Sequence, residues 1–92
     1  MRIEFDPLKD LTNQAKHGVS LAVAGELDWQ AALIRIDDRI DYNEQRRIGL
    51  VPHGGRLYCV AFVDRSTVRR IISLRRANRR EAKYYVENFQ TP

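Results

Sequence analysis

A carboxylate and several arginines occur in this sequence at spacings that could act on a phosphodiester. Glu44 and Arg46 are two residues apart, so on a strand both side chains would point to the same face. Residues 69–81 read RRIISLRRANRRE and hold six arginines in thirteen positions. Cleavage of RNA through its 2′-hydroxyl requires a base, an acid and cations that neutralise the phosphorane, but no metal ion. These residue types match that reaction, although an ordinary ion pair between Glu44 and Arg46 would give the same pattern.

Side chains for the proton transfers are available near the N-terminus, where Lys9, Lys16 and His17 occur within nine positions. The sequence gives less support to other kinds of chemistry. His17 and His53 are separated by 35 residues, and neither has a second histidine or a cysteine at a ligand spacing, so no metal site is expected. The sequence contains neither a nucleophile elbow nor a glycine-rich phosphate loop, and we expect no cofactor.

Length and composition indicate one small globular domain that spans residues 1–92. A chain of 92 residues buries only about 60 to 65 % of its unfolded surface, too little for two cores. Apolar residues make up 43 % of the chain, which favours a packed interior over disorder. The single cysteine, Cys59, lies in an apolar run and is expected to be a buried thiol in a reducing compartment. No apolar stretch approaches the roughly 18 residues of a membrane span, so we expect a cytoplasmic protein.

Basic residues are concentrated in the second half of the chain. Residues 1–45 contain five basic and nine acidic residues, whereas residues 46–92 contain eleven basic and three acidic ones. Thirteen of the sixteen bases are arginine, the side chain that binds phosphate through two parallel hydrogen bonds. This asymmetry favours a nucleic-acid surface, although a solvated basic face would have the same composition.

The periodicity of apolar residues predicts an α+β fold. Strands are expected over residues 2–6, 32–38, 42–51, 56–63 and 67–74, and helices over residues 10–17 and 20–29. Asn78 and Glu81 form a capping box that begins a C-terminal helix. We therefore expect a twisted antiparallel sheet with two N-terminal helices and a C-terminal helix packed on one face. The opposite face would remain open for a partner or substrate.

Alternation along the last expected strand assigns its side chains to two faces. One face would carry Val68, Arg70, Ile72 and Leu74, and the other Arg69, Ile71, Ser73 and Arg75. On this pattern Arg70 lies on the apolar face, poorly placed for catalysis, while Ser73 and Arg75 reach the open face. A β-bulge would shift the register and change this assignment.

Four ordered blocks of the sequence resemble one protein family. They are FDPLKDLTNQAKHGVSL, DYNEQRRIGLV, LYCVAFV and RRIISLRRANRREAKYY. Together they resemble the BrnT toxins of type II toxin–antitoxin systems, whose fold is a variant of the RelE/ParE-like ribonuclease fold. The resemblance implies an RNA-cleaving toxin that acts on RNA, with mRNA as the expected substrate, and so inhibits translation. It also implies a BrnA-type antitoxin as the partner, in a heteromeric complex such as a heterotetramer.

The resemblance also implies which residues form the site. The expected catalytic residues are Glu44, Arg46, Arg70 and Arg75, assisted by Lys16 and His17. Contacts to RNA are expected from Lys9, Arg47, Arg69 and Ser73.

Three positions depart from the family pattern. Phe5 stands where tryptophan is usual, Asn43 replaces a glycine and Leu74 replaces an alanine. Asn43 and Leu74 flank the expected site and could narrow it. Two other functions fit the same sequence: a basic module that binds nucleic acid without cleaving it, and a non-catalytic module that only binds the antitoxin.

Overall fold

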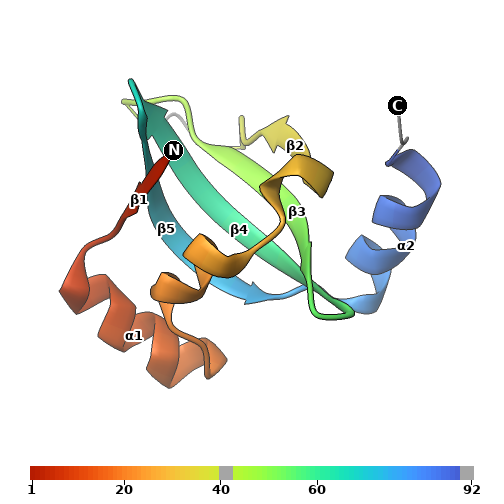
Figure 1. Ribbon diagram of the computed structural model, residues 1–92, viewed down its shortest axis with the longest axis horizontal. Helices are drawn as coiled ribbons and strands as arrows, with labels where there is room; N and C mark the ends of the chain where they lie inside the picture. The colour runs from red at the N-terminus through yellow and green to blue at the C-terminus, as the bar shows by residue number, and fades with distance from the viewer. Residues whose placement is uncertain (40–42, 90–92) are drawn as a thin grey trace.

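The described residues, 1–39 and 43–89 of the computed structural model, form one five-stranded sheet with helices on both faces (Figure 1). The spatial order of the strands is β1-β5-β4-β3-β2. Their bounds are β1 Arg2–Glu4, β2 Leu33–Ile36, β3 Arg47–His53, β4 Arg56–Arg65 and β5 Val68–Arg76. The α+β class is confirmed. The purely antiparallel sheet is wrong at one edge, because β1 pairs with β5 in parallel.

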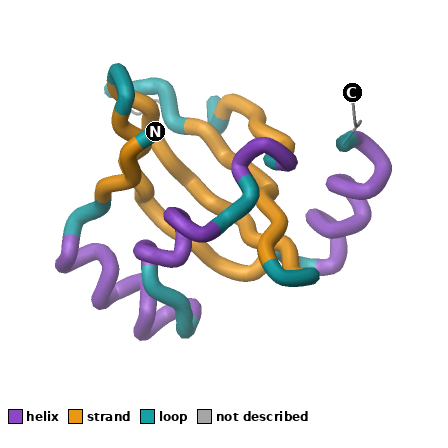
Figure 2. The backbone as a smooth tube through the Cα atoms, viewed as in Figure 1, coloured by secondary structure: helices purple, strands orange, loops and turns teal. Residues whose placement is uncertain are grey.

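Helical segments cover the two faces of the sheet unequally (Figure 2). They are α1 Pro7–His17, the 3₁₀ segments η1 Leu21–Glu26 and η2 Trp29–Ala31, and α2 Arg79–Asn88. The single helix expected over residues 20–29 is present only as two short 3₁₀ segments, so its type and length are wrong. Leu27 is extended, with φ −74° and ψ 153°, and the N–H of Asp28 donates to the carbonyl of Pro52 at 3.0 Å. Helices on one face only are also wrong, since η1 packs on one face and α2 on the other.

Local signals in the sequence define where several elements begin and end. The Asp6 side chain accepts from the N–H of Leu8 at 2.9 Å and so caps α1, which ends at Gly18 in the left-handed conformation. The predicted capping box of α2 is confirmed, with Asn78 and Glu81 each bonding the other's backbone N–H. Gly54 and Gly55, with φ 58° and 76°, form the tight turn between β3 and β4.

Two apolar clusters lie on opposite faces of the sheet. The first packs η1 against β3, β4 and β5, and its fully buried side chains include Leu21, Val60 and Phe62. The second is smaller and consists of Ile48, Leu50 and Cys59 beneath α2. Burial raises the pKa of the Cys59 thiol to about 11, which fits the expected buried free cysteine. Among the described residues, no helix is long and apolar enough to cross a membrane.

A β-bulge in β5 changes the predicted assignment of faces. Ala61 lies opposite Ser73, but the next residue of β4, Phe62, lies opposite Ile71, so Ile72 is the extra residue. The bulge places Ile71 and Leu74 together in the first cluster. Arg70 lies opposite Val63, which shares a face of β4 with Ala61. Arg70 therefore shares the face of Ser73, and the predicted opposite faces for these two residues are wrong.

The expected strand over residues 42–51 is shorter than predicted. β3 begins at Arg47, and residues 43–46 before it belong to no strand, although the Arg46 carbonyl accepts from the N–H of Asp37 at 2.8 Å. Tyr42 lies outside the described residues. Glu44 and Arg46 therefore lie on an irregular segment, and simple strand alternation does not determine where they point.

One side chain from α1 closes the free edge of β5. Asn13 is buried, and its amide donates to the carbonyl of Leu74 at 2.8 Å and to that of Val19 at 2.8 Å. Its oxygen accepts from the N–H of Leu74 at 3.1 Å. The amide thus bonds the strand edge as a neighbouring strand would, and it fixes α1 beside β5.

Removing the Asn13 amide should destabilise the protein. Asn13→Ala leaves the N–H and carbonyl of Leu74 without this partner, and we expect a loss of about 2 kcal/mol in the free energy of unfolding. Denaturant unfolding followed by circular dichroism would measure it. Gln14→Ala, at an exposed neighbouring position of α1, is the control and should change stability by less than about 0.5 kcal/mol. Equal stability of the two variants would contradict this role.

Candidate active site

Four basic side chains and one carboxylate line a cleft on the face of the sheet that η1 leaves uncovered. The cleft has a volume of about 240 Å³. Its lining residues are Lys9, Asn43, Glu44, Arg46, Val63, Arg65, Arg70 and Ile72. We call it the arginine cleft. The strand ends of β4 and β5, the segment before β3 and the first turns of α1 all contribute to it.

A second hollow, of about 220 Å³, lies along α1 and adjoins the arginine cleft. Its lining residues are Lys9, Thr12, Asn13, Lys16, His17, Ile72 and Ser73. Lys9 and Ile72 line both spaces, so the two form one continuous depression. The helical spacing of Lys9, Lys16 and the residues between them turns both lysines toward β5. We call this second space the α1 hollow.

Seven of the ten predicted site residues lie in this depression. Glu44, Arg46, Arg70 and Lys9 line the arginine cleft, and Lys16, His17 and Ser73 line the α1 hollow. The structure thus brings together segments that are far apart in the sequence. The bulge in β5 is what adds Arg70, since strict alternation would have turned it to the other face.

Glu44 is held as a carboxylate by Arg65. The Nε of Arg65 donates to Glu44 Oε2 at 3.0 Å, and its Nη2 donates to Oε1, so the contact is bidentate. This hydrogen bond, with the nearby charges of Arg65, Arg70 and Arg46, lowers the pKa of Glu44. Glu44 therefore has the ionised form that a general base needs, but the ion pair reduces its basicity.

The other arginines of the cleft have different surroundings. Arg70 donates to Glu4 of β1 at 3.1 Å, so a second carboxylate lies beside the cleft. The charge of Arg46 also contributes to the lowered pKa of Asp37, after the hydrogen bond from Arg39. Basic groups outnumber carboxylates in the lining, and an anionic ligand would be attracted there.

Arg69 lines neither space of the depression, although it was expected to contact RNA. Its residue is 8 % exposed, and its Nε donates to Asp64 at 2.7 Å. Its guanidinium lies 4.5 Å from the ring centroid of Trp29 and 4.3 Å from that of Phe62. The prediction that Arg69 shares a face with Ser73 and Arg75 is wrong, because the bulge turns Arg69 to the face that η2 covers, where its buried charge needs Asp64 as a partner.

Arg47 and Arg75 also lie away from the arginine cleft. Arg47 is next to Ile48 on β3 and points to the other face, where it lies 3.5 Å from Asp64. Arg75 is on the cleft side of the sheet, but both of its terminal nitrogens bond Glu81 of α2, at 2.8 and 2.9 Å. This pairing lowers the pKa of Glu81 to about 2. Arg75 thus anchors α2 and does not join the cleft.

Arg65 is a cleft residue that the sequence did not point to, whereas Asn43, which was expected to flank the site, lies in the lining. Arg65 fell between the strands expected over residues 56–63 and 67–74, whereas it is the last residue of β4 and lies opposite Val68. Alternation along β4 puts Ala61, Val63 and Arg65 on one face, and this signal could have identified Arg65. No local sequence pattern predicts the contact between Arg65 and Glu44, because the two residues are 21 positions apart.

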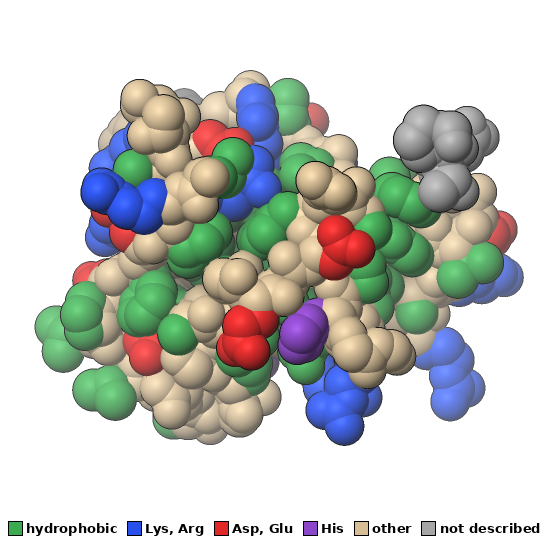
Figure 3. All heavy atoms as spheres, in the orientation of Figure 1, with side chains coloured by type: hydrophobic (Ala, Val, Ile, Leu, Met, Phe, Trp, Pro, Cys, Tyr) green, Lys and Arg blue, Asp and Glu red, His purple; other side chains and the backbone are tan. Residues whose placement is uncertain are grey.

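Basic groups gather in more than one place on the molecule. In the view of Figure 3, Lys and Arg side chains lie near the β1 side of the sheet and, separately, near the start of α2. In the part of the chain that the structure describes, no three His, Cys, Asp or Glu side chains are grouped so that they could hold a metal ion.

The comparison with protein families agrees with the resemblance. Residues 5–81 match the family model described as ribonuclease toxin, BrnT, of type II toxin–antitoxin systems. This match includes all the residues of the arginine cleft and of the α1 hollow. No curated protein matched the chain. Since the family match covers most of the 92 residues, the chain belongs to the BrnT family of ribonuclease toxins of type II toxin–antitoxin systems.

Proposed function

We propose that this chain cleaves RNA in the arginine cleft by attack of a 2′-hydroxyl on the adjacent phosphate, without a metal ion. The observation that supports it is the position of the Glu44 carboxylate among Lys9, Arg46, Arg65 and Arg70. A carboxylate can take the hydroxyl proton, and guanidinium groups can neutralise the charge that develops on the phosphorane. All of these groups come from the chain itself.

The proposed reaction uses the two spaces of the depression in turn. The proton of the 2′-hydroxyl passes to Glu44, the 2′-oxygen bonds to phosphorus, and the bond from phosphorus to the 5′-oxygen breaks. The departing oxygen takes a proton from a cationic side chain of the α1 hollow, for which Lys9, Lys16 and His17 are the candidates. The products are a 2′,3′-cyclic phosphate and a 5′-hydroxyl.

Arg65 has a double role in this proposal. In the free protein it is bonded to Glu44. A phosphate that enters the cleft would compete for the same guanidinium, because arginine binds phosphate and carboxylate with the same bidentate geometry. As Arg65 turns toward the phosphate, its hold on Glu44 weakens and the basicity of the carboxylate rises. Substrate binding would thereby activate the base.

The wider biology is also a proposal. We infer that the substrate is mRNA, that cleavage inhibits translation in the cytoplasm, and that a BrnA-type antitoxin neutralises the toxin in a heteromeric complex. A RelE/ParE-like relationship of the fold agrees with the antiparallel strands β2 to β5 and the site on their exposed face. The match to a family of type II toxins supports the antitoxin as a partner.

Glu44→Gln should abolish cleavage while RNA binding is retained. The amide cannot accept the hydroxyl proton as a base, so we expect a fall of about 100-fold or more in the single-turnover rate on a synthetic RNA. Gel-shift titration would measure binding. Glu87→Gln, at an exposed position of α2 outside the cleft, is the matched control and should cleave normally. Full activity of Glu44→Gln would disprove the base. Binding without cleavage by the wild type would favour a non-catalytic module.

Arg65→Ala should raise the pKa of Glu44 toward its ordinary value of about 4.5, because the bond that lowers it is lost. In the wild type, stability from this ion pair is present above that value and is lost as the pH falls through the lower pKa of the folded state. Carbon NMR titration of the Glu44 carboxyl would measure the shift.

The same variant should also cleave RNA about 100-fold more slowly at pH 7, since one cation of the cleft is missing. Arg56→Ala, at the exposed start of β4, is the control for a lost arginine and should behave as the wild type. An unchanged Glu44 titration curve in Arg65→Ala would contradict the pairing.

A further inference from the structure

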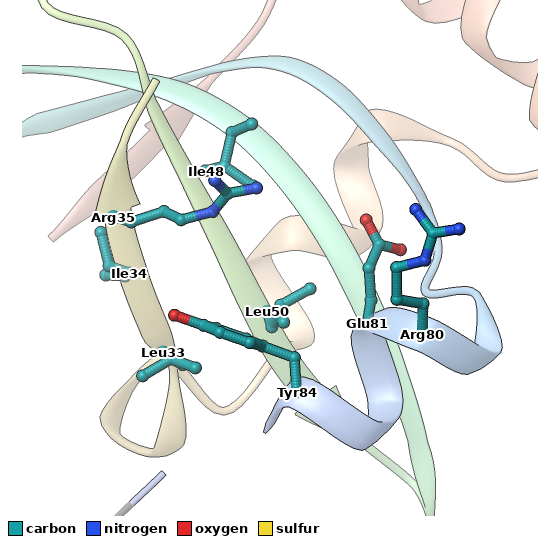
Figure 4. Close-up of a pocket in the computed structure, with 8 residues that line it drawn as sticks. All are labelled: Leu33, Ile34, Arg35, Ile48, Leu50, Arg80, Glu81 and Tyr84. Carbon is teal, nitrogen blue, oxygen red and sulfur yellow. The ribbon is translucent and has the colours of Figure 1, made fainter. Parts of the chain in front are cut away.

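A second concave surface lies between α2 and the strands β2 and β3 (Figure 4). It has a volume of about 270 Å³ and shares no lining residue with the arginine cleft. Its lining residues are Leu33, Ile34, Arg35, Ile48, Leu50, Arg80, Glu81 and Tyr84. We call it the α2 groove. None of these residues has a role in the cleavage proposed above.

The walls of the α2 groove are mostly apolar and partly exposed. Ile48 and Leu50 belong to the second apolar cluster and are buried, whereas no residue in the described span of α2 is buried. Ile34 is 40 % exposed and Tyr84 is 48 % exposed. In Figure 4 the Tyr84 ring extends from α2 toward β2 across the groove. Apolar surface that the chain leaves uncovered in this way is typical of a protein interface.

Polar contacts on two successive turns of α2 hold the helix beside the groove. Near the start of the helix, Glu81 bonds Arg75 of β5 at 2.8 Å. One turn later the hydroxyl of Tyr85 donates to the carbonyl of Ala31 at 2.6 Å. These contacts fix the position of α2 relative to the sheet. The helix is therefore already ordered before a ligand binds, and binding does not lose the free energy of ordering it.

The rim of the groove is cationic. Arg35 extends from β2 and Arg80 from the first turn of α2, on opposite sides of the groove (Figure 4). The one carboxylate in the lining, Glu81, is already bonded by Arg75 and by the N–H of Asn78. A segment with acidic side chains beside an apolar one would therefore be complementary to this surface.

Two other occupants fit less well. In a symmetric dimer of this chain the same patch would face itself, which would bring the arginines of the two rims together. RNA could contact the arginines at the rim, but the Leu and Ile side chains on the floor of the groove cannot bind a phosphate group. By contrast, the edge of β2 suits a polypeptide, because no described strand lies on its outer side and its backbone groups could pair with an added strand.

We propose that the α2 groove is the docking site of the antitoxin, and that it takes an acidic segment whose apolar side chain enters between Tyr84 and Ile34. The proposal rests on the type II antitoxin partner that the family supplies and not on the cleavage chemistry. An antitoxin bound there contacts the toxin outside the arginine cleft. Binding at the groove and cleavage at the cleft can therefore be measured separately.

Calorimetric titration of the full chain with its cognate antitoxin tests the proposal. Arg80→Glu reverses a rim charge and should weaken binding by about tenfold or more, with a smaller effect at high salt. Arg79→Glu, the neighbouring residue outside the lining, is the matched control and should bind within about twofold of the wild type. Both variants should cleave RNA at the wild-type rate.

A second matched pair tests the apolar contact. Ile34→Asp should weaken antitoxin binding by at least tenfold, whereas Val86→Asp, at a position of α2 that is 78 % exposed and outside the groove, should not. Tyr84→Ala replaces Ile34→Asp if that variant is unfolded by circular dichroism. Wild-type affinity of both Arg80→Glu and the apolar variant would overturn the proposal.

Other results identify a different occupant and would also overturn it. A wild-type dimer in sedimentation that Ile34→Asp or Tyr84→Ala converts to a monomer would assign the groove to a second copy of the chain. Weaker RNA binding by Arg80→Glu, with antitoxin binding unchanged, would assign it to RNA. If the wild type fails to cleave RNA but the groove variants lose the antitoxin, the cleavage mechanism fails and the docking site stands.

Discussion

The β-bulge at Ile72 determines which arginines of β5 face the candidate active site. Arg70 lies opposite Val63 and Ser73 opposite Ala61, so both share one face only because Ile72 is an extra residue between them. In a regular strand, residues three apart point to opposite faces. Arg70 would then be turned toward the first apolar cluster, and the arginine cleft would lose one of its four basic groups. A local irregularity of one residue thus decides the charge of the site.

Arg69, the residue before Arg70, points to the opposite face of the sheet and is buried there. Arg69 lies over the rings of Trp29 and Phe62 and bonds Asp64, whose pKa this hydrogen bond lowers. A buried guanidinium without such a partner would be strongly unfavourable. With its charge compensated by Asp64 and the two rings, the Arg69 side chain packs against Trp29 and so holds η2 against the sheet. Arg69 therefore contributes to the fold and lies outside the arginine cleft.

The sequence predicts those parts of the fold that depend on neighbouring residues. The capping box of Asn78 and Glu81 is such a local signal, and the structure has it. The connection between the strands expected over residues 42–51 and 56–63 is likewise the turn at Gly54 and Gly55. The first helix was expected to begin only at Asp10, whereas α1 begins at Pro7 after the cap at Asp6. The parallel pairing of β1, the bulge and the 3₁₀ segments depend on distant contacts, for example that of Asp28 with Pro52. The same holds for the candidate site. Glu44 and Arg70 were predicted as site residues from their side-chain types and from the family resemblance. The hydrogen bond from Arg65 to Glu44 could not be predicted, because it joins residues 21 positions apart.

The doubled arginines of residues 69–80 can be understood from strand and helix geometry. Adjacent residues of a strand point to opposite faces, so Arg69 and Arg70 could not form one patch: one enters the apolar side and the other the cleft. On the same strand, Arg75 is bonded to Glu81 and orients α2. On α2, Arg80 reaches the groove while Arg79 lies outside its lining. The arginines of this segment therefore have separate positions: one in the apolar core, one in the cleft, one bonded to α2 and one at the groove. A count of charges along the sequence does not distinguish these positions.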